Sequence, residues 1–137
     1  MLTQPKKTKY RKSFKPRGLP HNSNKSCHLG EYNFFAIIAA ESGYLNAKQM
    51  EAARQNIRRK ISREGKLLLL LSPNIPITKT ASSARMGKGK GKVNHWVTSI
   101  AAGQKIFILY GIDREQGIPA LYSGANKLPL KLKIREL

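Results

Sequence analysis

The residues from Asn46 to Gly65, "NAKQMEAARQNIRRKISREG", constrain the fold more than any other stretch, because they predict one long amphipathic helix. Asn46 is a favourable N-cap residue, and Gln49 stands three positions later, where a capping box has its reciprocal partner. Gly65 is expected to end the helix in the left-handed conformation. Apolar side chains recur at helical spacing on one face, which is predicted to pack into a core: Met50, Ala53, Ile57 and Ile61.

Short strand patterns lie on both sides of this helix. Residues 29–40 are rich in aromatic and β-branched side chains and predict a strand, and residues 41–44 predict a turn. The run "KLLLLL" at 66–71 is too short for another helix next to Gly65 and Pro73, so it predicts a strand buried on both faces.

The C-terminal part of the chain continues the mixed order. Residues 93–101 and 105–112 predict a hairpin that turns through Gly103 and Gln104. A short helix is expected at 118–127, with Pro119 in its first turn. Apolar and basic side chains alternate in 130–135, which predicts a strand with one buried and one basic face. Strands divided around two helices indicate an α+β class, a single compact domain with a mixed sheet.

The chain carries 26 Lys and Arg residues against 7 Asp and Glu, a formal net charge of +19. Such a surplus repels itself in a compact state, so it indicates a partner with a regular array of negative charges, nucleic acid or an anionic membrane. With 40% hydrophobic residues in 137 positions, the chain can still bury a core. The single cysteine, Cys27, fits a reducing compartment, and the apolar runs are too short for a membrane span.

Residues 1–25 contain eight basic residues and no acid, and their prolines and glycine interrupt any helix. The chain is therefore divided into an extended arm, 1–25, that becomes ordered against RNA, and a globular domain, 26–137. Tyr10 and Phe14 either stack on bases or dock on the protein's own core. A solvated tail and a solvated helix face are the alternatives to RNA contact. The arm and the polar side of the long helix supply the predicted RNA-binding residues: Lys6, Lys7, Lys9, Tyr10, Arg11, Lys12, Lys15, Arg17, Arg54, Arg58, Arg59 and Arg63.

The segment "ARMGKGKGK" at 84–92 lies in a longer predicted loop, 73–92. A nucleotide-binding P-loop has four residues between its glycines and a hydroxyl residue after its lysine. Here three residues separate Gly87 from Gly91, and Val93 follows Lys92, so a nucleotide site is rejected. A linker fits poorly, because the segment joins strands of one domain. Glycine lets the main chain approach a partner closely, so N–H groups and cationic heads can meet RNA phosphates.

Five motifs occur in the order found in a known family: "PKKTKYRK" at 5–12, "QMEAARQNIRR" at 49–59, "PIT" at 76–78, "ARMGKGKGKVNHWV" at 84–97 and "KLP" at 127–129. Together they span nearly the whole chain, which resembles the universal large-subunit ribosomal protein L-sixteen family. The resemblance implies an α/β-hammerhead-type fold. It also implies a site on large-subunit rRNA beside the aminoacyl-tRNA and peptidyl-transferase region.

By the same resemblance the arm contacts rRNA, and the partners are rRNA, tRNA and neighbouring ribosomal proteins rather than a second copy of the chain. The tip of the loop would reach toward tRNA and the catalytic centre through these residues: Arg85, Met86, Gly87, Lys88, Gly89, Lys90, Gly91 and Lys92. Departures from the family pattern, together with many Lys, Asn and Ile residues, suit an organelle genome. A mitochondrion is therefore expected, with a plastid or a bacterial cytoplasm as alternatives.

Enzymatic chemistry and a cofactor are not expected. Cys27 and His28 are adjacent, and neighbouring side chains of an extended segment point to opposite faces. One Cys and three His without paired spacing do not predict a zinc site. His95, beside Trp96, is interpreted as a packing residue or an RNA contact. Two other classes stay as alternatives: a free-standing RNA chaperone or DNA-compacting protein, and a membrane-surface protein held by its polybasic arm.

Overall fold

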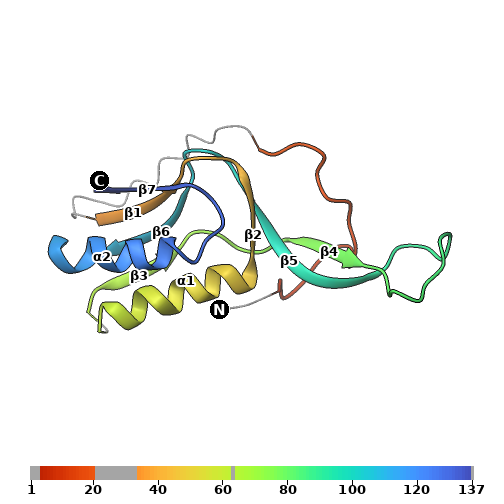
Figure 1. Ribbon diagram of the computed structural model, residues 1–137, viewed down its shortest axis with the longest axis horizontal. Coiled ribbons are helices and arrows are strands. Elements are labelled where there is room, and N and C mark those ends of the chain that lie inside the picture. Colours follow the sequence, from red (N-terminus) through yellow and green to blue (C-terminus); the bar gives the residue numbers. More distant parts are fainter. Residues whose placement is uncertain (1–3, 21–33, 63, 137) are drawn as a thin grey trace.

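A computed structural model of the chain describes residues 4–20, 34–62 and 64–136 (Figure 1). Within these ranges the helices and strands follow in the order β1 (Phe34–Ala39), β2 (Gly43–Asn46), α1 (Ala47–Lys60), β3 (Lys66–Leu69), β4 (Ile75–Lys79), β5 (Lys92–Ile100), β6 (Lys105–Tyr110), α2 (Arg114–Ala125) and β7 (Leu132–Glu136). The predicted α+β class is confirmed.

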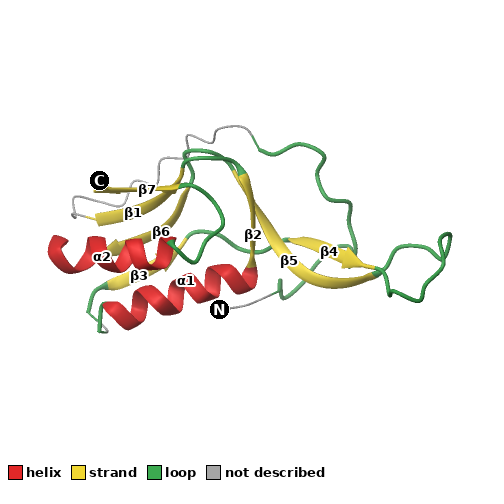
Figure 2. Cartoon of the chain, viewed as in Figure 1, coloured by secondary structure: helices red, strands yellow, loops and turns green. Residues whose placement is uncertain are grey.

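The described strands form two antiparallel sheets, where one mixed sheet was expected. A four-stranded sheet has the order β3-β6-β1-β7, and a three-stranded sheet has the order β2-β5-β4. The helices lie beside the four-stranded sheet, while β4 and β5 extend away from them (Figure 2). The molecule therefore has a helix-covered body and a projecting strand pair.

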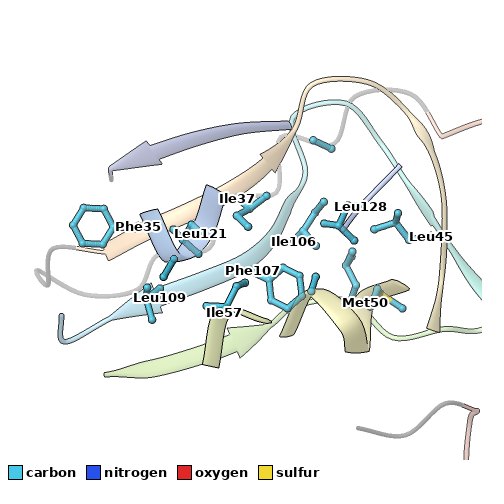
Figure 3. Close-up of a cluster of buried hydrophobic side chains, with 14 of the residues drawn as sticks. Phe35, Ile37, Leu45, Met50, Ile57, Ile106, Phe107, Leu109, Leu121 and Leu128 are labelled. Carbon is cyan, nitrogen blue, oxygen red and sulfur yellow. The ribbon is translucent and has the colours of Figure 1, made fainter. Parts of the chain in front are cut away.

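The capping box of α1 forms as predicted. The Asn46 side-chain oxygen accepts a hydrogen bond from the Lys48 N–H at 3.3 Å, and the Asn46 N–H donates to Gln49 Oε1 at 2.9 Å. The predicted apolar face is buried, with 1% exposure or less at each residue: Met50, Ala53, Ile57 and Ile61. Figure 3 shows Met50 and Ile57 among side chains of the four-stranded sheet and α2.

The end of α1 differs from the prediction. The helix stops at Lys60, and Ile61 is its C-cap. Ser62 takes a left-handed conformation with φ 47°, before Gly65 does so with φ 61°. The stop expected at Gly65 is thus placed too late, because a non-glycine residue adopts the left-handed conformation first.

The second helix begins at Arg114, four residues earlier than the predicted residue 118, and contains Pro119 in its interior. Its buried face includes Gly117 and Gly124, because α2 packs closely on its neighbours. A Cβ added at Gly124 would lie 2.6 Å from Ile57 Cδ1, so glycine permits the contact between α1 and α2. Gly124 weakens the prediction of a helix from the sequence, but it permits α2 to pack closely on α1.

The leucine run is an edge strand rather than a strand buried on both faces. β3 pairs only with β6 among the described strands. Its side chains alternate between the two faces of the sheet: Leu68 and Leu70 are 37% and 39% exposed, while Leu67 and Leu69 pack against the core. The prediction of burial on both faces failed because a run of leucines does not reveal that one face of the strand is exposed to solvent. At the opposite edge, β7 has the predicted pattern of half-buried Leu132 and Ile134 with exposed Lys133 and Arg135.

The predicted hairpin of 93–101 and 105–112 does not form. β5 pairs with β2 and β4, whereas β6 pairs with β1 and β3. The turn at Gly103, with φ 83°, carries the chain from one sheet to the other, and the Gly103 N–H donates to the Ala39 carbonyl at 2.8 Å. Part of the predicted turn at 41–44 belongs to β2.

Candidate nucleic-acid interface

A strand pair carries the glycine–lysine segment away from the body. β4 pairs with β5 in a register that places Lys79 opposite Lys92. The predicted loop, 73–92, therefore contains a strand, and the residues between the paired strands are 80–91. This segment, called here the basic loop, forms the end of the molecule farthest from the helices (Figure 1).

Two kinds of glycine shape the basic loop. Gly91 stands where β5 begins, and a Cβ there would overlap the Lys79 carbonyl and lie 2.8 Å from the Thr80 nitrogen. Gly87 and Gly89 have φ values of 83° and 81°, with nothing within 4 Å of an added Cβ. Gly91 therefore permits a close approach of two backbones, whereas the other two permit left-handed turns at the open tip.

The side chains of the basic loop are turned to solvent in this structure. Residues 80–90 are exposed, and Met86 at the tip is fully exposed. A hollow of about 750 Å³ lies at the loop, called here the loop hollow. Six cationic residues and no acid contribute to its wall: Lys12, Lys79, Arg85, Lys88, Lys90 and Lys92. Such a wall concentrates positive potential and suits phosphate groups.

The N-terminal arm meets the basic loop through a set of contacts that we call the arm–loop clamp. Lys12 Nζ donates to the Lys90 carbonyl at 2.8 Å, and Lys90 Nζ donates to the Ser13 carbonyl at 2.8 Å. Lys90 Nζ also lies 4.1 Å from the centre of the Phe14 ring, within cation–π range. Lys90 thus holds the arm, while Lys88 and Arg85 make no such contact among the described residues.

Beyond the clamp, the arm follows β2. The Tyr44 hydroxyl donates to the Pro16 carbonyl at 3.2 Å, and Lys15 Nζ lies 4.2 Å from the centre of the Tyr44 ring. The arm itself remains outside the core, because Tyr10 is 69% and Phe14 89% exposed. The alternative in which these rings dock on the protein's core is therefore wrong. The other predicted arm residues, from Lys6 to Arg17, are exposed as well.

The predicted arginines of α1 are not brought to the arm or the basic loop. Arg54 Nε and Nη2 donate to the two Glu51 carboxylate oxygens at 2.9 and 2.7 Å. The hydrogen bonds from Arg54 lower the pKa of Glu51 to about 2, opposed by burial and supported by the Gln55 amide. Arg58 Nη1 lies 3.4 Å from the Gly65 carbonyl, and Arg59 is exposed.

The last turn of α1 lies at the opposite end of the molecule from the basic loop (Figure 1). Arg63, Cys27, His21 and His28 lie outside the described residues. Across 4–20, 34–62 and 64–136, no group of three or more His, Cys, Asp or Glu could hold a metal ion. No described helix has the length and apolar content to cross a membrane.

The arm–loop clamp and β4 were missed in the sequence. Lys12 and Lys90 are 78 residues apart, and each looks like one more solvated cation in its own segment. The "PIT" segment at 76–78 gives a weak strand signal, because proline removes a backbone donor. Only the pairing of Pro76 with Trp96 at the edge of the three-stranded sheet shows how it is accommodated.

A basic arm held against a glycine–lysine loop, both mounted on a small α+β body, is an arrangement typical of ribosomal proteins. The chain belongs to the family described as ribosomal protein L16p/L10e, whose model matches residues 5–135. The prediction that the chain is a ribosomal protein and not an enzyme is confirmed by this membership.

Relatives named large ribosomal subunit protein uL16 align over nearly the whole chain. The protein of Blochmanniella pennsylvanica is 42% identical over 131 residues, which cover 96% of this chain and 96% of that protein. Those of Thioalkalivibrio sulfidiphilus and Caulobacter vibrioides are 41% and 36% identical, over 95% and 97% of this chain and 93% and 92% of theirs. These relatives are bacterial, and they give the expected mitochondrial location no support.

Proposed function

We propose that this chain is a structural protein of the large ribosomal subunit, in which the arm and the basic loop bind large-subunit rRNA. The segment from Arg85 to Lys92, which includes the tip of the basic loop and the first residue of β5, lies near the A site and the peptidyl-transferase region and helps to position tRNA. The observation that carries this proposal is the loop hollow, where Lys12 of the arm joins cations of the basic loop with no carboxylate among them. The names of the relatives support the subunit, and the resemblance supports the tRNA contact.

The geometry supports two different roles for the cations, one in holding the arm and one in binding phosphates. The arm–loop clamp occupies the ammonium groups of Lys12 and Lys90 with backbone carbonyls. Arg85 and Lys88 remain exposed and are the side chains proposed to meet phosphates of tRNA or rRNA. Met86, fully exposed beside them, supplies an apolar group that can lie against a ribose or a base.

Sedimentation of the tagged chain from cells tests the structural role. Co-migration with large subunits after a high-salt wash is expected, because the arm and the basic loop must be released together from an assembled particle. Recovery at the top of the gradient would contradict the proposal and favour a free-standing RNA chaperone.

The tRNA role is tested with Lys88→Ala on purified ribosomes. Slower tRNA accommodation with normal subunit content is expected. Lys60→Ala is the matched control, since it removes the same charge from an exposed residue at the far end of α1. Equal effects of the two variants would contradict a specific role for the loop.

The compartment stays a prediction from composition and from departures from the family pattern. A mitochondrial source predicts that the tagged chain sediments with mitochondrial ribosomes, whereas a bacterial or plastid source predicts the ribosomes of that compartment.

A further inference from the structure

A second hollow, of about 340 Å³, lies between the arm, the start of α1 and β5. Its wall includes Gln4 and Arg11 of the arm, Lys48 of α1, and Asn94, His95 and Trp96 of β5. Asn94 also borders the loop hollow, so the two hollows adjoin along β5. We call this second site the arm pocket. Its size is at the lower end of the roughly 300–1,000 Å³ that small-molecule sites occupy.

Apart from Asn46, the polar side chains that line the arm pocket have no partner within the described part of the chain. The structure gives no side-chain hydrogen bond or ion pair to Gln4, Arg11 or Asn94. The same holds for the side chains of Lys48, His95 and Trp96. In contrast, Asn46 at the edge of the pocket uses its side chain to cap α1. Gln4, Arg11, Lys48 and Asn94 are exposed, so these side chains are accessible to a polar ligand in the pocket.

The side chains that line the arm pocket indicate the chemical class of the ligand. Arg11 and Lys48 are exposed cations, and the wall contains no Asp or Glu, so the ligand carries negative charge. Two amide side chains and an imidazole can donate to and accept from the edge of a base. Trp96 is half-buried and offers aromatic surface of the kind on which bases stack. A ligand with a phosphate, a polar base edge and a ring that can stack is a nucleotide.

We propose that the arm pocket receives one unstacked nucleotide of an RNA strand whose neighbouring phosphates lie along the loop hollow. The proposal rests on the RNA-binding function proposed above and adds a single-stranded substrate for it. A duplex cannot place a base there, because its bases are stacked and its grooves present mostly backbone and 2′-hydroxyl groups. Arg11 and Lys48 would hold the phosphate, and Gln4, Asn94 and His95 would select the base.

Trp96 is the only tryptophan of the chain and therefore reports on the arm pocket directly. The full-length protein is titrated with a single-stranded RNA hexamer and, separately, with a blunt RNA duplex of equal phosphate content. Quenching of Trp96 emission by the hexamer is expected, with little change from the duplex even where filter binding shows that it is bound. A hexamer that binds and leaves Trp96 emission unchanged overturns the proposal.

Asn94→Ala tests the polar wall. Loss of the hydrogen bonds to a base edge is expected to weaken hexamer binding about 5- to 10-fold while duplex binding stays the same. Gln4→Ala is the second variant, because a change in the exposed arm cannot unfold the domain. Lys88→Ala is the matched control and should weaken both RNAs alike. An equal loss for hexamer and duplex in Asn94→Ala and Gln4→Ala overturns the proposal.

The third titration uses a free nucleoside monophosphate. Quenching by the free nucleotide at the same concentration as the hexamer would indicate a soluble-nucleotide site, which overturns the RNA part of the inference. Failure to bind either RNA would contradict the proposed function as well. Normal sedimentation with large subunits combined with unquenched Trp96 would contradict the arm pocket alone.

Discussion

Gly87 and Gly91 stand four positions apart in the basic loop and meet different physical requirements. An alanine at 91 would push its Cβ into the backbone of Lys79 and Thr80, which cannot move without opening the end of the hairpin. An alanine at 87 would meet no atom and would only be strained by its left-handed backbone, at a cost of about 1–2 kcal/mol if the local conformation is kept.

We therefore expect Gly91→Ala to lower the free energy of unfolding by about 1–3 kcal/mol, the range of a steric misfit in a packed region. Gly87→Ala should lower it by less, because the open tip can change shape and release the strain. Urea unfolding followed by circular dichroism measures both. Equal losses would contradict the assignment of Gly91 to a backbone contact.

The ion pair of Glu51 and Arg54 gives a stability that depends on pH. The pKa of Glu51 lies at about 2, below its ordinary 4.5, so the stabilisation is present above pH 4.5 and lost as the pH falls toward 2. Because the Arg54 side chain is 36% exposed, solvent screens the pair. Glu51→Gln should cost only about 0.5 kcal/mol at neutral pH.

Thermal unfolding of the two proteins at several pH values measures this difference. The gap in melting temperature between wild type and Glu51→Gln should narrow as the pH falls from 4.5 to 2. A gap that is constant over that range would show that the carboxylate charge does not stabilise the helix.

At the scale of elements, α1 and α2 are joined by two hydrogen bonds from Asn56 to Ser123 and by a close contact that requires glycine. Gly124 faces Ile57 so closely that an added methyl group would overlap its side chain. Alanine favours helix by about 1 kcal/mol over glycine, but overpacking costs about 1–3 kcal/mol. We expect Gly124→Ala to be destabilising overall.

Shortening the partner should relieve the overlap. Ile57→Ala removes both atoms that an alanine at 124 would meet, Cγ1 and Cδ1, so the double variant should lose less stability than the sum of the two single losses. Urea unfolding of the four proteins completes the double-mutant cycle. Additive losses would show that the helices separate instead of packing against the new methyl group.

The arm–loop clamp joins two segments that have no regular structure of their own. Lys90→Ala removes the hydrogen bond to Ser13 and the cation over Phe14, so the arm should become more mobile. We expect the NMR order parameters of the backbone in residues 4–20 to fall, with the melting temperature of the domain unchanged. Lys88→Ala is the matched control and should leave the order parameters of the arm as they are. Identical order parameters in both variants would contradict the clamp.

Elements that depend on local sequence were predictable, and those that depend on distant pairing were not. The capping box, the buried face of α1 and the half-buried β7 follow from spacing within a few residues. The edge position of β3 and the separation of β5 from β6 depend on which strands pair across the chain. The basic loop was visible from composition, whereas the arm pocket draws on three separate segments and has no local signal.

At the scale of the whole molecule, the net charge of +19 is arranged along the arm and the projecting hairpin as well as on the body. If about six phosphates are neutralised, the affinity for an rRNA fragment should follow a log–log salt slope of about −4 to −5. A weak dependence on salt would contradict phosphate contacts as the source of affinity.

Deletion of residues 2–17 tests whether arm and loop form one surface. The deletion removes seven cations, including Lys12 of the clamp, and it should make the salt slope shallower by several units while impairing incorporation into the large subunit. Arg85→Ala combined with Lys88→Ala should change the slope by about 2 at most, since each phosphate contact contributes about one unit.

If the arm acted only through its charge, a Lys12→Arg, Lys90→Arg variant would behave as the wild type. If the clamp also sets the conformation of the basic loop, that variant should keep the salt slope and still slow tRNA accommodation. A guanidinium group is longer and planar, so it meets the two backbone carbonyls in a different geometry from an ammonium group.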